Sequence, residues 1–112
     1  MKELEITTLK NQDGGVKVVL NGFIDAYSYR QLEKVFNDLM EQNVYKLVVD
    51  LSQVDYLCSG GAGVLIGVYG IIQENNGNIV LLNPKSSVKE MLELLGLSNI
   101  FSIINTPSSQ SA

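Results

Sequence analysis

Apolar residues recur along this chain with two different spacings, which predict strands and helices. Short apolar runs such as 47–49 and 79–82 are bounded by polar or turn-forming residues, which is typical of strands buried on both faces. A turn at 11–15, in which Asp13 precedes Gly14, separates two apolar segments as a hairpin turn does. We therefore expect strands at about residues 4–6, 16–20, 46–51, 79–82 and 100–104.

Helical spacing predicts three helices. The first ends at Asn43 and carries a single apolar stripe made of Leu32, Val35, Phe36, Leu39 and Met40. The second covers about 59–75, and the third begins at 87 and is stopped by Gly96. Two helix starts have the spacing of capping boxes, Ser28 with Gln31 and Ser87 with Glu90.

The 59–75 helix is unusual because it contains five glycines, namely Gly60, Gly61, Gly63, Gly67 and Gly70. Its helical spacing is carried by Ala62, Leu65, Ile66 and Tyr69. Each interior glycine costs roughly 1 kcal/mol relative to alanine. We expect two compensations: close packing of the helix on the sheet, and a surface that lets another backbone or a phosphate approach.

The predicted order of elements is β-β-α-β-α-β-α-β, which indicates the α/β class. It predicts a single domain whose mostly parallel sheet has an N-terminal β-hairpin and helices supplied by βα repeats. We expect the domain to cover 1–106, followed by a flexible polar tail at 107–112. A loop is expected at 52–57, with Val54 and Leu57 turned inward. Sites on such sheets lie beyond the carboxyl ends of the strands, so the loops 22–25 and 57–61 should converge there.

Composition narrows the function classes. The chain has 112 residues, a net charge of −4, one cysteine and no histidine. The acidic balance argues against nucleic acid as a partner, and the missing histidine argues against Ser-His or Cys-His catalysis and a zinc site. The uncharged stretch 57–73 is too short for a convincing membrane span, and the N-terminus lacks an apolar signal region. We expect a cytoplasmic, non-enzymatic protein without metal, cofactor or direct membrane insertion.

These segments resemble the STAS domain family, specifically the bacterial anti-sigma factor antagonists. Residues 21–25 look like the family's Gly-x-x-Asp segment, and 48–52 look like its core strand. Residues 58–63 stand where the family has its signature, Asp-Ser-Ser/Thr-Gly-x-Gly. Later landmarks fit at 81–84 and 94–97. The resemblance runs from about residue 4 to 106 and implies a STAS-like fold.

The resemblance also implies a function, partner switching. The unmodified antagonist binds an anti-sigma factor that is also a serine kinase, and so releases a sigma factor. Phosphorylation of the second signature hydroxyl breaks this complex, and a phosphatase, of the PP2C type, resets it. Here Gly60 occupies the acceptor position, Cys58 replaces the signature aspartate, and Ser59 is the only hydroxyl left. The switch is therefore either missing or displaced to Ser59, which is the phosphorylation candidate.

The expected partner-binding residues are Gly22, Asp25, Cys58, Ser59, Gly60, Gly61, Ala62 and Leu65. Each has a plainer interpretation beside the functional one. Asp25 either binds a basic group of a partner or caps the first helix, and Ser59 is either modified or only an N-cap. Cys58 is more simply a small, partly buried residue than a redox sensor.

Two other functions remain open at this stage. One is a STAS accessory subunit of a lipid or small-molecule transport complex. The other is an enzyme with Cys58 or Ser59 as nucleophile, which the missing histidine makes a poor candidate. Nucleotide binding is disfavoured, because the glycines at 61–67 miss the G-x-G-x-x-G spacing by one residue.

Overall fold

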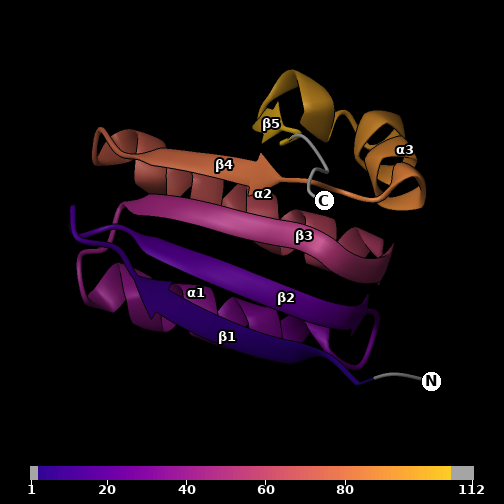
Figure 1. The fold of residues 1–112 in the computed structure, drawn as a ribbon, viewed down its shortest axis with the longest axis horizontal. Helices are drawn as coiled ribbons and strands as arrows, with labels where there is room; N and C mark the ends of the chain where they lie inside the picture. Colours follow the sequence, from indigo (N-terminus) through magenta and orange to yellow (C-terminus); the bar gives the residue numbers. More distant parts are fainter. Residues whose placement is uncertain (1–2, 107–112) are drawn as a thin grey trace.

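A computed structural model describes residues 3–106 and shows one five-stranded sheet with three α-helices. The strand order is β1-β2-β3-β4-β5, with β1 antiparallel to β2 and every later pair parallel (Figure 1). The elements in chain order are β1 (Glu5–Lys10), β2 (Val16–Ile24), α1 (Tyr29–Glu41), β3 (Lys46–Leu57), α2 (Ser59–Glu74), β4 (Asn78–Leu82), α3 (Ser86–Leu94), a 3₁₀ turn η1 (Leu97–Asn99) and β5 (Ser102–Ile104). The predicted α/β class, N-terminal hairpin and mostly parallel sheet are confirmed. The predicted tail at 107–112 lies outside the described residues.

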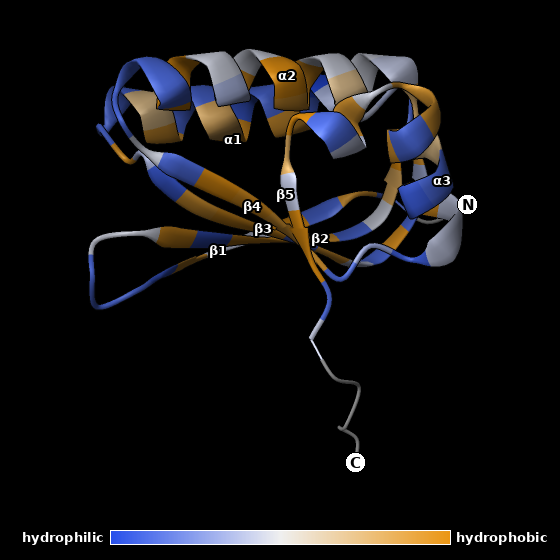
Figure 2. Cartoon of the chain, turned by 90° about the horizontal axis from the view of Figure 1, so that it is seen from above, coloured by the Kyte–Doolittle hydropathy of each residue, from blue (hydrophilic) through white to orange (hydrophobic). Residues whose placement is uncertain are grey.

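The core lies between the sheet and two helices. Helices α1 and α2 lie side by side over one face of the sheet, and α3 lies at the end where β4 finishes (Figures 1 and 2). Burial alternates strictly along β2, because every second side chain points towards α1 and α2. The most completely buried large side chains include Phe36, Leu20, Leu51, Leu65 and Leu81, which come from both layers.

The two central strands are longer than the sequence pattern predicts. The predicted loop 52–57 is wrong, since β3 continues to Leu57. The loop predicted at 22–25 is also mostly strand, because β2 continues to Ile24. The pairing of β2 with β3 contains two register shifts, one between Val19 and Asn21 and one between Gly22 and Phe23. Pairing continues beyond them, so that Gly22 faces Val54 and Ile24 faces Leu57. Val54 and Leu57 are nonetheless buried, as predicted.

Gly22 is required by the backbone of β2. Its φ of +120° lies where side chains are strained, and a Cβ placed on it would stand 2.4 Å from the carbonyl oxygen of Glu3. The residue therefore lets the segment before β1 cross close to β2. Gly22 is buried, so it cannot contact a partner directly and affects the surface only by shaping the backbone beneath it.

The helix ends were predicted better than the helix starts. Asn43 and Gly96 follow α1 and α3 with φ values of 60° and 80°, as their predicted stop roles require. Both predicted capping boxes are wrong: Ser28 makes no side-chain cap bond at the start of α1, and the N-cap of α3 is Lys85. The last strand is also shorter than predicted, because η1 precedes it and β5 covers only Ser102–Ile104.

The face of α2 that packs on the sheet differs in part from the predicted apolar stripe, which included Ile66 and Tyr69. Ile66 is 44% exposed, and the buried face instead contains Ala62, Leu65, Val68 and Ile72. Among the glycines, Gly61 packs so closely that a Cβ on it would meet Ile24 at 2.5 Å. A Cβ on Gly63, Gly67 or Gly70 would meet nothing within 4 Å. Close packing on the sheet therefore explains Gly61 but not these three outward-facing glycines.

We predict opposite effects for alanine at two of these positions. Gly22→Ala should lower the free energy of unfolding by roughly 2–4 kcal/mol, because it adds both φ strain and a clash with the Glu3 carbonyl. Gly67→Ala should raise it by about 0.5–1 kcal/mol, because the added methyl group meets open space within a helix. Urea denaturation of both variants and the parent checks this, and equal effects would contradict the assigned role of Gly22.

Candidate functional site

The two segments expected to converge do meet at one edge of the sheet. The amide of Cys58 donates a hydrogen bond of 2.8 Å to the carbonyl oxygen of Ile24, joining the end of β2 to the start of α2. The side chains of Phe23 and Tyr56 also contact each other, with ring centroids 6.4 Å apart. We call the region made by residues 23–28 and 56–60 the convergent edge. It holds four of the predicted partner-binding residues, Asp25, Cys58, Ser59 and Gly60.

Asp25 closes the turn between β2 and α1. Its Oδ1 accepts hydrogen bonds from the amides of Tyr27 at 2.9 Å and Ser28 at 3.0 Å. The Tyr27 amide bond is the main cause that holds the pKa of Asp25 below its ordinary value of 3.8. The carboxylate is therefore ionised at neutral pH. Its predicted role as a cap of the first helix is wrong, because the N-cap of α1 is Ser28 and Asp25 instead closes an Asx-type turn before the helix.

Ser28 fixes the same turn through its hydroxyl group. The hydroxyl oxygen accepts the amide proton of Asp25 at 2.9 Å, and the hydroxyl donates to the carbonyl oxygen of Phe23 at 2.7 Å. This use of the hydroxyl explains why Ser28 does not cap α1. The turn that presents Asp25 and Tyr27 is thus held by its own short polar side chains.

The tip of α2 places Ser59 in solvent. The N-cap is Cys58, whose sulfur accepts the amide of Gly61 at 3.4 Å, so the predicted N-cap role of Ser59 is wrong. Cys58 is half-buried and its thiol is free. Ser59 is the first helical residue and is exposed, which leaves its hydroxyl accessible at the positive end of the helix dipole.

Gly60 lies under an aromatic ring. A Cβ on Gly60 would stand 3.1–3.2 Å from ring atoms of Tyr29, closer than ordinary side-chain contact. The guanidinium of Arg30 lies 5.3 Å from the centroid of the same ring. Gly60 therefore offers no hydroxyl, and it is covered on one side by Tyr29.

The remaining predicted partner-binding residues lie beneath the surface. Gly22, Gly61, Ala62 and Leu65 are all buried. A charge at position 61 would enter the space occupied by Ile24 and Leu57, so Gly61→Asp would disturb folding and is a poor probe of binding. Contact with a partner can come directly only from Asp25, Cys58, Ser59 and Gly60 within the predicted set.

The structure adds aromatic residues that sequence reasoning missed. Tyr27 is 94% exposed and Tyr56 is 44% exposed. Together they border a mostly apolar hollow of about 430 Å³, here called the aromatic hollow, lined by Phe23, Asp25, Ala26, Tyr27, Tyr56 and Cys58. A signal was present in the sequence, since Tyr27 lies two residues after Asp25 and outside the apolar stripe of the predicted first helix, so it has no core position to fill.

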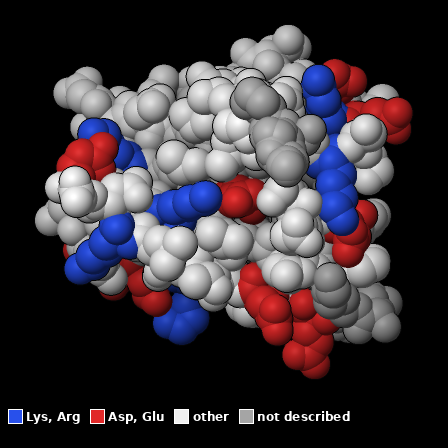
Figure 3. Space-filling view, in the orientation of Figure 1, with Lys and Arg blue, Asp and Glu red and all other residues white. Residues whose placement is uncertain are grey.

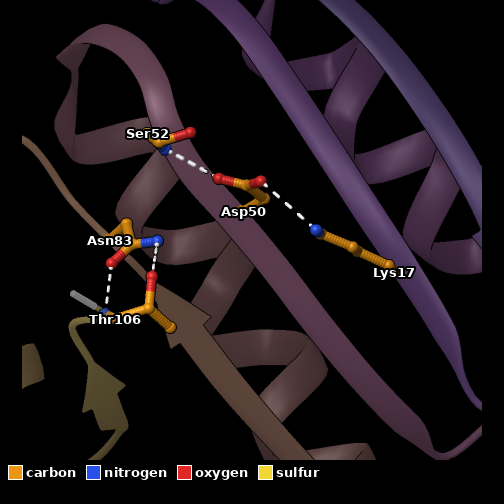
Figure 4. Close-up of polar contacts among 5 residues, drawn as sticks. All are labelled: Lys17, Asp50, Ser52, Asn83 and Thr106. Atoms are coloured by element: carbon orange, nitrogen blue, oxygen red, sulfur yellow. Dashed lines mark hydrogen bonds and ion pairs between the residues drawn. The ribbon is translucent and has the colours of Figure 1, made fainter. Parts of the chain in front are cut away.

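The opposite face of the sheet carries a separate set of polar contacts (Figure 4). Asp50 accepts the amide of Ser52 at 2.9 Å and lies 3.7 Å from the ammonium of Lys17. Asn83 and Thr106 exchange hydrogen bonds of 2.7 and 2.9 Å, which fix the chain after β5. The Lys17–Asp50 contact joins β2 to β3, the Asp50–Ser52 bond lies within β3, and the Asn83–Thr106 bonds join the segments after β4 and β5; none of these residues belongs to the convergent edge.

Within residues 3–106, no group of three or more Cys, Asp or Glu side chains is arranged to hold a metal ion. No helix of this part has both the length and the apolar character needed to cross a membrane.

The sequence model of the STAS domain family matches residues 7–110. Among curated relatives, BtrV of Bordetella bronchiseptica is 28% identical over 105 residues, which cover 94% of this chain and 90% of BtrV. The anti-sigma-B factor antagonist of Staphylococcus aureus is 25% identical over 100 residues, which cover 89% of this chain and 90% of that protein.

Solved structures give the same fold. The chain matches an anti-sigma factor antagonist from Mycobacterium paratuberculosis with a TM-score of 0.79 and 27% identity, covering 94% of this chain and 90% of the other. It matches the unphosphorylated form of the anti-sigma factor antagonist SpoIIAA with a TM-score of 0.75 and 15% identity, covering 96% and 94%. At this low identity, the second match speaks for the fold alone.

We predict that the acceptor oxygen of Asp25, more than its charge, stabilises the fold. Asp25→Ala should lower the free energy of unfolding measurably, whereas Asp25→Asn should leave it close to that of the parent, because asparagine retains the Oδ1 acceptor. Because the folded state lowers the pKa of Asp25, any advantage of the carboxylate over asparagine is present at neutral pH and is lost as the pH falls below 3.8. Urea denaturation of both variants at neutral and acidic pH measures this, and equal losses at neutral pH would refute it.

Proposed function

Because the chain belongs to the STAS domain family, we propose that it is an anti-sigma factor antagonist, which binds an anti-sigma factor and thereby releases a sigma factor. The observation that carries this proposal is the match along nearly the whole chain to relatives that bear this name. A protein with this role acts by occupying a partner, so the proposal requires an exposed docking surface and no bond-making step. It also implies that the protein acts in the cytoplasm, where sigma factors engage RNA polymerase.

The docking surface that we propose is the convergent edge. Asp25, Cys58, Ser59 and Gly60 supply its accessible atoms, while Gly22, Gly61, Ala62 and Leu65 support it from below. Gly22 belongs to β2, and the other three are buried on the face of α2 that packs on the sheet, so the surface is held in one shape before the partner arrives. Preorganisation of this kind lowers the entropy lost on binding.

The proposed partner is an anti-sigma factor that is also a serine kinase, and we propose that this antagonist lacks the usual phosphorylation switch. Gly60 has no hydroxyl, and the Tyr29 ring lies against the position that an acceptor side chain would need. Ser59 is exposed, but it precedes Gly60 by one residue, which rotates its side chain by about 100° around the helix axis. A PP2C-type phosphatase belongs to this scheme only if the kinase modifies Ser59 instead.

The partner can be identified by affinity purification from the native host. We expect an anti-sigma factor to be recovered, whereas recovery of transporter components in its place would refute the proposal and support a transport accessory subunit. Ser59→Glu, which adds charge and bulk at the α2 tip, should weaken binding of the recovered anti-sigma factor at least tenfold.

Gln73→Glu is the matched control for that variant. It adds the same charge to an exposed position near the other end of α2, and it should leave the dissociation constant unchanged. Calorimetric titration of both variants measures the difference. Equal affinities of the two variants would place the docking surface elsewhere.

If the phosphorylation switch is missing, the protein should stay unphosphorylated even when kinase and ATP are supplied. The protein is incubated with the recovered kinase and ATP, and the modified residues are identified by mass spectrometry. We expect no stoichiometric phosphate at residues 58–63, because the acceptor position lacks a hydroxyl. Stoichiometric phosphate on Ser59 would show that the switch is displaced rather than missing.

A further inference from the structure

We propose that the aromatic hollow is an anchor pocket for an arginine side chain of the protein partner, with Asp25 as its counter-ion and Tyr27 and Tyr56 as its aromatic walls. This inference rests on the proposed function for the identity of the partner. The chemistry of the pocket can be tested without that partner.

The two tyrosines that form the aromatic walls are exposed, and the fold does not require an aromatic side chain at Tyr27. Tyr27 is 94% exposed, and it lies in a turn that is already fixed by bonds to Asp25 and Ser28. It also separates the aromatic hollow from a neighbouring hollow of about 340 Å³, which includes Glu3 and Gln31 in its lining. Exposed tyrosines beside a concave surface are typical of residues that contribute strongly to protein binding.

Asp25 offers a carboxylate oxygen that the turn does not use. Its Oδ1 accepts the amide protons of Tyr27 and Ser28 and lies 3.1 Å from the Ser28 hydroxyl oxygen, and no residue within 3–106 bonds to Oδ2. The side chain lines both hollows. The turn amides keep the pKa of Asp25 below its ordinary value, so Oδ2 carries negative charge at neutral pH.

Two basic side chains of the described segment already have partners. Arg30 lies over the ring of Tyr29, and Lys85 forms an ion pair with Asp55. Figure 3 shows acidic side chains gathered at the lower right, near the start of β1 and the end of β2. The surroundings of the hollow therefore favour a cation and disfavour an anion from outside.

Arginine fits this combination better than other cationic groups. Its apolar stem can lie in the hollow, its guanidinium can stack on a tyrosine ring, and its fork of N–H donors can reach a carboxylate oxygen. Lysine would offer a compact, strongly hydrated charge with a weaker preference for aromatic faces. The chain already shows the same pairing internally, where Arg30 lies 5.3 Å from the centroid of the Tyr29 ring.

The first experiment measures binding to the anti-sigma factor recovered from the native host. Asp25→Asn preserves the turn acceptor but removes the charge, and Tyr27→Ala removes an exposed ring. Each should weaken binding at least tenfold, and raising the salt concentration should weaken the parent more than Asp25→Asn. The matched controls are Asp38→Asn, which removes an exposed charge from α1, and Leu94→Ala, which removes an 80% exposed side chain from α3; both should bind like the parent.

The second experiment uses N-acetyl-arginine methylamide as the probe, with its neutral citrulline analogue as control. The arginine probe should produce saturable chemical-shift changes at Tyr27 and Tyr56, and Asp25→Asn should abolish them. The citrulline analogue should produce none.

The outcomes separate this inference from the proposed function. Partner binding by the parent with unaffected Asp25→Asn and Tyr27→Ala variants would overturn the anchor and leave the function standing. Recovery of no anti-sigma factor would overturn the function, and the anchor would then be decided by the probe. Equal shifts from the arginine and citrulline compounds, or none from either, would overturn the anchor.

Discussion

The pairing of β2 with β3 up to their last residues determines the rest of this structure. Ile24 faces Leu57 in the parallel ladder, and the next amide, that of Cys58, donates back to Ile24. The turn that leaves β2 and the helix that follows β3 must therefore start at the same edge. A register slip of one residue would reverse the faces of these strands and separate the two segments, which is a strong constraint on the sequence.

This constraint divides the residues of the edge into two groups with different physical roles. Buried residues such as Gly22 and Gly61 allow close approach of backbone and side chains, and their replacement acts first on folding. Exposed residues such as Tyr27 and Ser59 contribute little to the core. The residue types at these positions can therefore be selected for binding a partner rather than for stability. The convergent edge thus combines a buried base that fixes its shape with exposed side chains that are available for contact, as the proposed binding role requires.

Much of the fold followed from periodicity, because alternating and helical apolar patterns report burial directly. The order of elements, the hairpin and the stop residues Asn43 and Gly96 were predicted correctly. The strand ends at 22–25 and 52–57 were predicted wrongly, since the β2–β3 ladder continues through two register shifts, past Asn21 and Gly22 in β2 and past the interrupted burial alternation of β3. The spacing of apolar residues within one strand does not show how the neighbouring strand pairs with it, so register shifts of this kind cannot be predicted from it.

The candidate site was predicted less completely than the fold. The resemblance to a family directed attention to the α2 tip, but it gave no reason to consider Tyr56, whose position in an assumed loop concealed its place on β3. The hydroxyl of Ser28 was expected to cap a helix, yet it bonds to the Phe23 carbonyl because β2 ends closer than the pattern indicates. Side-chain partners of this kind depend on tertiary distances, which a single sequence does not report.

The most direct test of the central claim is a hydrogen-exchange footprint of the protein bound to its purified anti-sigma factor. The account predicts that complex formation slows amide exchange at residues 23–28 and 56–60, while exchange in β1 and at the carboxyl end of α1 stays as in the free protein. Slowed exchange confined to the sheet face opposite α1 and α2, with the convergent edge unchanged, would contradict it.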